Sequence, residues 1–135
     1  VSTAIGIYSL MKITKKHNIK VMLCGEGLNS MFPSKNVSEL QVLSVQLLED
    51  LHKHSLLLWD RIAGMFDIEV RFPWLDKDII DFILKIKPNL RLPQIFNNQS
   101  IPKYIIKKSF DGSSLLPSET LWRLPESFNI NIQEF

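Results

Sequence analysis

The feature that most constrains the fold is a short apolar run followed at once by glycines, in the segment Lys20–Phe32 (K-V-M-L-C-G-E-G-L-N-S-M-F). The run Val21–Leu23 has no polar alternation, which favours a strand covered on both faces, as in a parallel sheet. The glycines of Gly25–Gly27 would let the backbone turn sharply and approach a ligand closely. Ligands of open α/β sheets bind outside the carboxyl ends of strands, so Glu26 is a candidate site residue. A strand-ending turn with a solvated glutamate fits the same pattern.

Composition is that of an ordinary globular domain, or of a piece of a larger one. Apolar residues make up 45% of the 135 residues and the formal net charge is +2, so we expect neither a nucleic-acid partner nor a membrane partner. The single cysteine, Cys24, excludes an internal disulfide framework and is compatible with a reducing compartment, which favours a cytoplasmic location. The N-terminal residues resemble the interior of a domain rather than a signal peptide.

Helical periodicity predicts a helix from about Thr3 to His17 that leads into a strand at Lys20–Cys24, which is half of a doubly wound α/β unit. No further strand is evident downstream, so the remainder is expected to be mostly helical. The expected helices are Ser38–His54 with a capping box at its start, Leu56–Met65, Asp76–Lys87, Pro102–Phe110 and a last turn from Leu116.

Four charged residues are interpreted as structural. Asp60 and Arg61 lie in a segment that is apolar on nearly every side, and as neighbours on a helix they cannot pair with each other. If buried, each needs a partner elsewhere. The segment Asp67–Asp76 (D-I-E-V-R-F-P-W-L-D) is expected to be an ordered loop, because its proline excludes a helix. Arg71 is expected to make hydrogen bonds beneath this loop, and Asp76 to cap the next helix.

Little other chemistry follows from pattern alone. Lys103 and Lys107 lie one turn apart on an expected helix, where a solvated face explains them as well as a binding role. The sequence has no Cys/His cluster with metal-ligand spacing and no recognisable Ser-His-Asp set. Cys24 is expected to be a small buried residue rather than a nucleophile.

Four stretches, in order, resemble motifs of one family. They are C-G-E-G-L-N-S-M-F from Cys24, D-R-I-A-G-M-F-D-I-E-V-R-F-P-W-L-D from Asp60, P-K-Y-I-I-K-K-S-F from Pro102, and L-L-P-S-E-T-L-W-R-L-P-E-S-F from Leu115. Together they resemble the synthetase domain of class B asparagine synthetases and their relatives, which include β-lactam synthetases and lasso-peptide cyclases. The resemblance covers nearly the whole chain.

The resemblance implies an α/β fold, here the mostly helical portion of a PP-loop, adenine-nucleotide-hydrolase-like (Rossmann-like) synthetase domain. It also implies ATP and Mg²⁺ as cofactors. Family chemistry adenylates a carboxylate, which a nitrogen nucleophile then attacks with release of AMP. In asparagine synthetase the carboxylate is that of aspartate, and ammonia comes from a separate N-terminal glutaminase domain.

Site residues carry over by position. Glu26 matches a glutamate that lines the acyl-adenylate and ammonia site, within the nucleotide and substrate loop Gly25–Gly27. Lys103 matches a lysine that contacts the phosphate and carbonyl of the intermediate, where a cation stabilises developing negative charge. Both are therefore expected to be catalytic.

The departures from the family pattern are equally specific. The pyrophosphate loop of the S-G-G-x-D-S type is missing, as is the glutaminase domain; the loop is expected upstream of Val1. The Mg²⁺-binding aspartate is Asn29 and the next glutamate is Ser30, and a neutral amide is a weaker Mg²⁺ ligand than a carboxylate. The lysine of the W-R-x-K stretch is Pro125.

Three hypotheses remain open. Residues 1–135 would be the C-terminal part of an asparagine-synthetase-like, ATP-dependent ligase domain, inactive alone. They would alternatively be a degenerate, non-catalytic relative that acts as a binding module, or a relative that activates a different carboxylate. A single strand would expose a sheet edge, so we expect association with an N-terminal half or with a second copy.

Overall fold

The computed structural model describes residues 2–33 and 39–124, which form a mixed α/β structure that is mostly helical. The elements in order are α1 (Ser2–Lys16), β1 (Val21–Leu23), α2 (Leu28–Met31), α3 (Leu40–Leu51), α4 (Ser55–Gly64), β2 (Glu69–Arg71), a 3-10 turn (Pro73–Leu75), α5 (Lys77–Lys85), α6 (Pro88–Arg91), β3 (Gln94–Phe96), β4 (Gln99–Ile101), α7 (Tyr104–Phe110) and α8 (Ser118–Trp122).

The strands β1 and β2 form a parallel pair, in which Met22 lies beside Val70. The Cys24 N–H donates to the Arg71 carbonyl over 2.8 Å and extends the ladder by one residue. The sequence-based expectation of one strand was therefore wrong. Residues 68–72 alternate apolar and polar side chains, which is a strand pattern, but the proline that follows favoured a loop.

One core cluster lies where α1 and α4 pack on each other and against the parallel strands. Its buried side chains are Ile7, Met11, Ile62, Ala63 and Ile68. Met22 and Val70 point into this cluster, whereas Val21 and Leu23 point away and are 42% and 69% exposed. The expectation that β1 is covered on both faces was therefore wrong for the described residues.

A second core cluster joins α2, α5 and α7. Met31, Phe32 and Ile83 are buried at its centre, and the apolar stripe of α5 packs there as the periodicity predicted. Asp76 caps α5, since its carboxylate accepts hydrogen bonds from the backbone N–H groups of Asp78 at 3.0 Å and Ile79 at 3.4 Å. The predicted capping role of Asp76 is confirmed.

Other expectations needed correction. Helix α4 is not buried all round: Asp60 and Arg61 are both exposed, so neither needs a buried partner. Helix α3 begins after Glu39, and the proposed cap Ser38 lies outside the described residues. The expected loop Leu90–Ser100 contains the antiparallel β3–β4 hairpin. Its turn residues Asn97 and Asn98 both have positive φ, as a type I′ hairpin turn requires.

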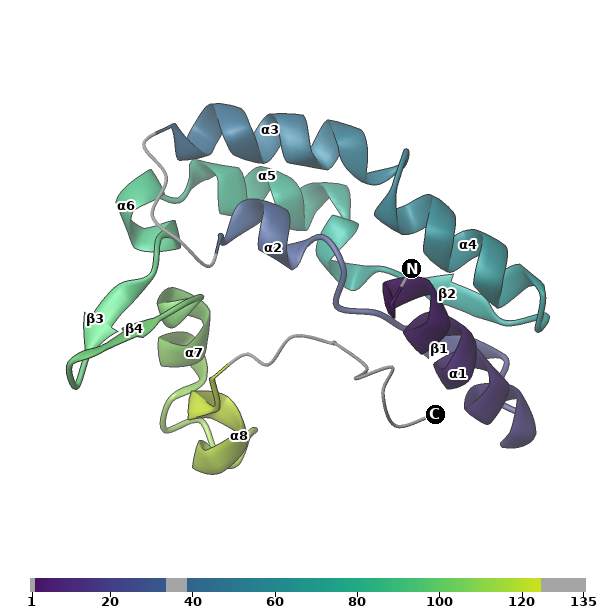
Figure 1. Ribbon diagram of the computed structural model, residues 1–135. Coiled ribbons are helices and arrows are strands. Elements are labelled where there is room, and N and C mark those ends of the chain that lie inside the picture. The colour runs from purple at the N-terminus through teal and green to yellow at the C-terminus, as the bar shows by residue number, and fades with distance from the viewer. Residues whose placement is uncertain (1, 34–38, 125–135) are drawn as a thin grey trace.

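Figure 1 shows how these parts are arranged. Helices α3 and α5 run along one side, the β1–β2 pair lies with α1 and α4 at one end, and the β3–β4 hairpin lies with α6, α7 and α8 at the other. Within the described residues, no helix has the length and apolar character needed to span a membrane.

Candidate functional site

The glycine loop Gly25–Gly27 lies at the carboxyl end of β1 and leads directly into α2. Gly27 has φ 93°, a conformation that favours glycine, and a Cβ there would overlap the side chain of Leu75. Leu75 belongs to the turn that follows β2. The loops at the carboxyl ends of the two parallel strands are therefore packed against each other.

Two features of this loop suit a ligand. A Cβ added to Gly25 would meet no atom within 4 Å, so the backbone there borders open space. The side chain of Glu26 is half-buried beside it.

Burial raises the pKa of the Cys24 thiol, and a hydrogen bond with the Glu26 backbone opposes that rise only in part. Cys24 thus favours the neutral thiol, which supports a packing role rather than a nucleophilic one.

The donor set for Mg²⁺ is poor in the described residues. Asn29 is exposed on α2 and presents only a neutral amide, while Ser30 is buried at 8% exposure. The described part of the chain contains no group of three His, Cys, Asp or Glu side chains that could hold a metal ion. These residues alone do not form a hard-cation site.

Lys103 does not lie in the helix that the sequence predicted. Helix α7 begins one residue later, and Lys103 is its N-cap in the left-handed conformation, with φ 57° and ψ 31°. Its side chain is half-buried. Burial lowers the pKa of its amine, and repulsion from the positive charge of Lys107 lowers that pKa further. A strained and partly desolvated cation of this kind is typical of functional positions.

Lys107 has a different role from Lys103. Its ammonium group donates to the carbonyl of Leu121 over 2.9 Å and to that of Arg123 over 2.6 Å. These acceptors lie at the end of α8, where free carbonyls attract a cation. Lys107 therefore fastens α8 to α7.

The loops that carry Glu26 and Lys103 are anchored in the same core. The glycine loop continues into α2, whose Leu28 and Met31 belong to the second core cluster. Lys103 precedes α7, whose Ile105 and Ile106 pack against that cluster. The structure thus joins the two sequence-predicted site segments through shared packing.

Arg71 corrects a sequence-based expectation. Its Nε donates to the Glu69 carboxylate over 2.6 Å, and both side chains are exposed on the face of β2 that points away from the core. Residues two apart in a strand share a face, so the pair follows from β2 being a strand. Arg71 does not order the loop from beneath.

Asp60, with Glu69, borders a small pocket of about 140 Å³ between α4 and β2.

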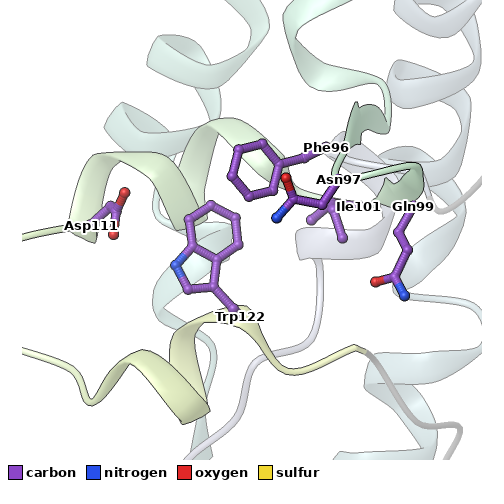
Figure 2. Close-up of a pocket in the computed structure, with 6 residues that line it drawn as sticks. All are labelled: Phe96, Asn97, Gln99, Ile101, Asp111 and Trp122. Carbon is purple, nitrogen blue, oxygen red and sulfur yellow. The ribbon is translucent and has the colours of Figure 1, made fainter.

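Sequence reasoning missed the packing of the β3–β4 hairpin against α8, next to the residue that follows Lys103. A pocket of about 300 Å³ lies between the β3–β4 hairpin and α8, lined by Phe96, Asn97, Gln99, Ile101, Asp111 and Trp122 (Figure 2). The rings of Phe96 and Trp122 stack at its wall, 5.3 Å apart and inclined by 16°. The adjacent asparagines of the turn, Asn97 and Asn98, were the available sequence signal for this hairpin.

Comparison with known proteins gives a consistent result. A family model described as "Asparagine synthase" matches residues 32–134. Proteins named "Asparagine synthetase [glutamine-hydrolyzing]" are similar along 98% of the chain: one from Gallus gallus at 32% identity over 140 residues, one from Cricetulus griseus at 30% over 142, and one from Homo sapiens at 29% over 142. The chain spans 24% of the length of each of these relatives.

Proposed function

Because the chain belongs to the asparagine synthase family, we propose that residues 1–135 form the C-terminal part of the synthetase domain of an ATP-dependent, amide-forming ligase. The observation that carries this proposal is the packing of Gly27 against Leu75, which places two family motifs together at the carboxyl ends of parallel strands. That edge is where open α/β sheets bind their ligands. The fold is then a portion of a PP-loop, Rossmann-like domain.

Glu26 and Lys103 are the proposed catalytic residues. Lys103 would stabilise the negative charge that develops on the phosphate and the carbonyl oxygen, since it is a half-buried cation without an anionic partner among the described residues. Glu26 would face the incoming nitrogen nucleophile from the glycine loop. Aspartate is the proposed carboxylate, as the names of the relatives suggest.

The described residues fit the nucleotide only in part. The open space beside Gly25 and the cation of Lys103 suit the phosphates of ATP, which supplies the leaving group that activates the carboxylate. The exposed amide of Asn29 does not replace a carboxylate ligand for Mg²⁺. We therefore assign no role in the reaction to Mg²⁺ bound by this segment alone.

The open face of the sheet suits a partner. Val21 and Leu23 expose their side chains on one face of the β1–β2 pair. Among the described residues, β1 pairs with β2 along one edge and with no strand along its other edge. An N-terminal half of the same kind of synthetase, or a second copy, would cover this edge. Replacing Leu23 with Asp should then weaken self-association in sedimentation velocity. A monomeric, cooperatively unfolding wild-type chain would contradict the self-association proposal.

A specific observation favours a second candidate, a non-catalytic binding module. Asn29 and Ser30 stand where the family has two acidic residues, so the segment lacks their charge. Calorimetric titration of Mg-ATP into the chain separates the candidates. Under the ligase proposal, binding is measurable and weakens at least several-fold in Lys103→Ala and Glu26→Gln.

The matched control is Lys12→Ala, which removes an exposed lysine on α1 and should leave binding unchanged. No heat of binding from a folded wild-type chain would support the module instead. Equal weakening in the Lys12 variant would show only a general charge effect.

A further inference from the structure

Three aromatic side chains from separate segments meet beside Lys103. Tyr104 on α7 lies 5.7 Å from the ring of Phe96 on β3 and 5.9 Å from the ring of Trp122 on α8. Phe96 and Trp122 stack directly on each other, as Figure 2 shows. Tyr104 is the residue next to Lys103, so this aromatic trio (Phe96, Tyr104 and Trp122) fixes the start of α7.

Polar contacts hold Trp122 in place from both sides. Lys107 binds the carbonyls of the residues immediately before and after it, Leu121 and Arg123. Lys108 holds the pKa of Asp111 below its ordinary value, and the Trp122 side chain, which lines the same pocket as Asp111, adds a smaller contribution. The position of the indole is therefore set at its backbone and at its ring face.

Lys103 needs such support because its backbone is strained. A residue with a side chain is less stable in the left-handed conformation than in the right-handed one. It stays there only when its surroundings determine the conformation. The residue that follows it is held by the aromatic trio, and Lys107, one turn further along α7, fastens α8 to the same helix.

From this geometry we infer that Trp122 is a positioning residue for Lys103: through Tyr104 and the α7–α8 contact, it holds the lysine in the conformation that the site needs. The inference rests on the proposed function in that Lys103 is the group that meets the phosphate.

The test measures the amine of Lys103 directly in the full chain. Lysines are methylated with ¹³C-formaldehyde, the Lys103 signal is assigned by its loss in Lys103→Arg, and its pKa is obtained by NMR titration. In Trp122→Ala, the Lys103 pKa should move upward toward the ordinary lysine range, because the amine becomes more mobile and more hydrated. Trp122→Phe, which keeps a ring on Tyr104, should retain most of the wild-type value.

Trp59→Ala is the matched control, since Trp59 is a half-buried tryptophan that packs on the other core cluster. It should leave the Lys103 signal in place. An unmoved Lys103 pKa in folded Trp122→Ala, or an equal shift in the Trp59 variant, would overturn the inference. If Trp122→Ala does not fold, Phe96→Leu decides the question, because it removes only the exposed ring stacked on the indole and should cause a smaller upward shift.

Titration of Mg-ATP into the same variants separates the two proposals. A shifted Lys103 pKa with no nucleotide binding by the wild type would uphold the positioning role and reject the ligase site. Nucleotide binding that is lost in Lys103→Ala but kept in Trp122→Ala would uphold the site and reject the positioning role.

Discussion

Gly27 and Leu75 are packed so closely that no side chain larger than hydrogen fits between them. One residue follows β1 and the other follows β2, so their contact couples the two loops at the carboxyl ends of the parallel strands. A change in either loop should therefore be transmitted to the other.

Replacing Gly27 with Ala should lower the free energy of unfolding by at least about 1 kcal/mol, from the positive φ and the overlap with Leu75 together. Urea unfolding measures this loss. Gly25→Ala is the control and should be close to neutral, because a Cβ there meets nothing within 4 Å. Adding Leu75→Ala to Gly27→Ala should cost less than the two single effects added together, since the overlap is removed.

Replacing Asp76 with Ala should cost about 1 kcal/mol of stability, because the backbone N–H groups of Asp78 and Ile79 in the first turn of α5 lose their acceptor. Asp76→Asn keeps an oxygen acceptor at the N-cap and should restore most of the loss. Thermal unfolding of the two variants measures the difference. Equal destabilisation by Ala and Asn would show that the charge of Asp76, rather than its hydrogen bonds, supports the helix.

Arg91 is the largest fully buried side chain among the described residues, and its guanidinium donates to the Met31 carbonyl over 3.3 Å and to the Ser44 hydroxyl over 3.2 Å. Arg91→Met should destabilise the chain by about 1 to 3 kcal/mol, because these buried acceptors lose their donor. Arg61→Met removes an exposed arginine and should stay within about 0.5 kcal/mol of wild type. Chemical denaturation compares the two.

The ion pair between Lys15 and Asp67 predicts an acid-sensitive contact. The hydrogen bond from Lys15, 2.8 Å long, lowers the pKa of Asp67 in the folded state. Its stabilisation is thus fully present above the unfolded-state pKa, near 3.8, and is lost as the pH falls through the lower folded value. Asp67→Asn should remove this part of the pH dependence of urea unfolding. Asn also tolerates the positive φ at this position.

Lys103→Gly should be at least as stable as the wild type, although it removes the proposed catalytic cation. Glycine adopts the left-handed conformation without strain, and the variant no longer places a charge in a half-buried site. Thermal unfolding together with calorimetric titration of Mg-ATP tests both parts. A clear loss of stability would mean that Lys103 supports the fold and would argue against its proposed role.

Local signals in the sequence predicted the long elements well. Helix α1, the strand at Val21–Leu23, the cap at Asp76 and the apolar stripe of α5 are confirmed, because each depends on periodicity or on one capping residue. The short strand β2 was missed because three residues beside a proline carry little periodic signal, and their pairing with β1 is a tertiary effect.

The site was predictable to a different extent. Family motifs pointed to Glu26 and Lys103, but no pattern in the sequence indicates that Lys103 lies outside the helix in a left-handed conformation. The next residue, Tyr104, contacts Phe96 on β3 and Trp122 on α8, which lie before and after it in the chain. The aromatic trio is likewise invisible to local periodicity, because its members come from three different elements.

The parallel pairing of β1 with β2 also has a consequence for folding kinetics. Helices α2, α3 and α4 lie between these strands in the chain, so their pairing must close a long loop before it contributes any stability. Such non-local contacts form slowly compared with helices. The edge at the carboxyl ends of these strands, which exists only when both strands are in register, should therefore be among the last parts of the molecule to form and among the first to be lost on unfolding.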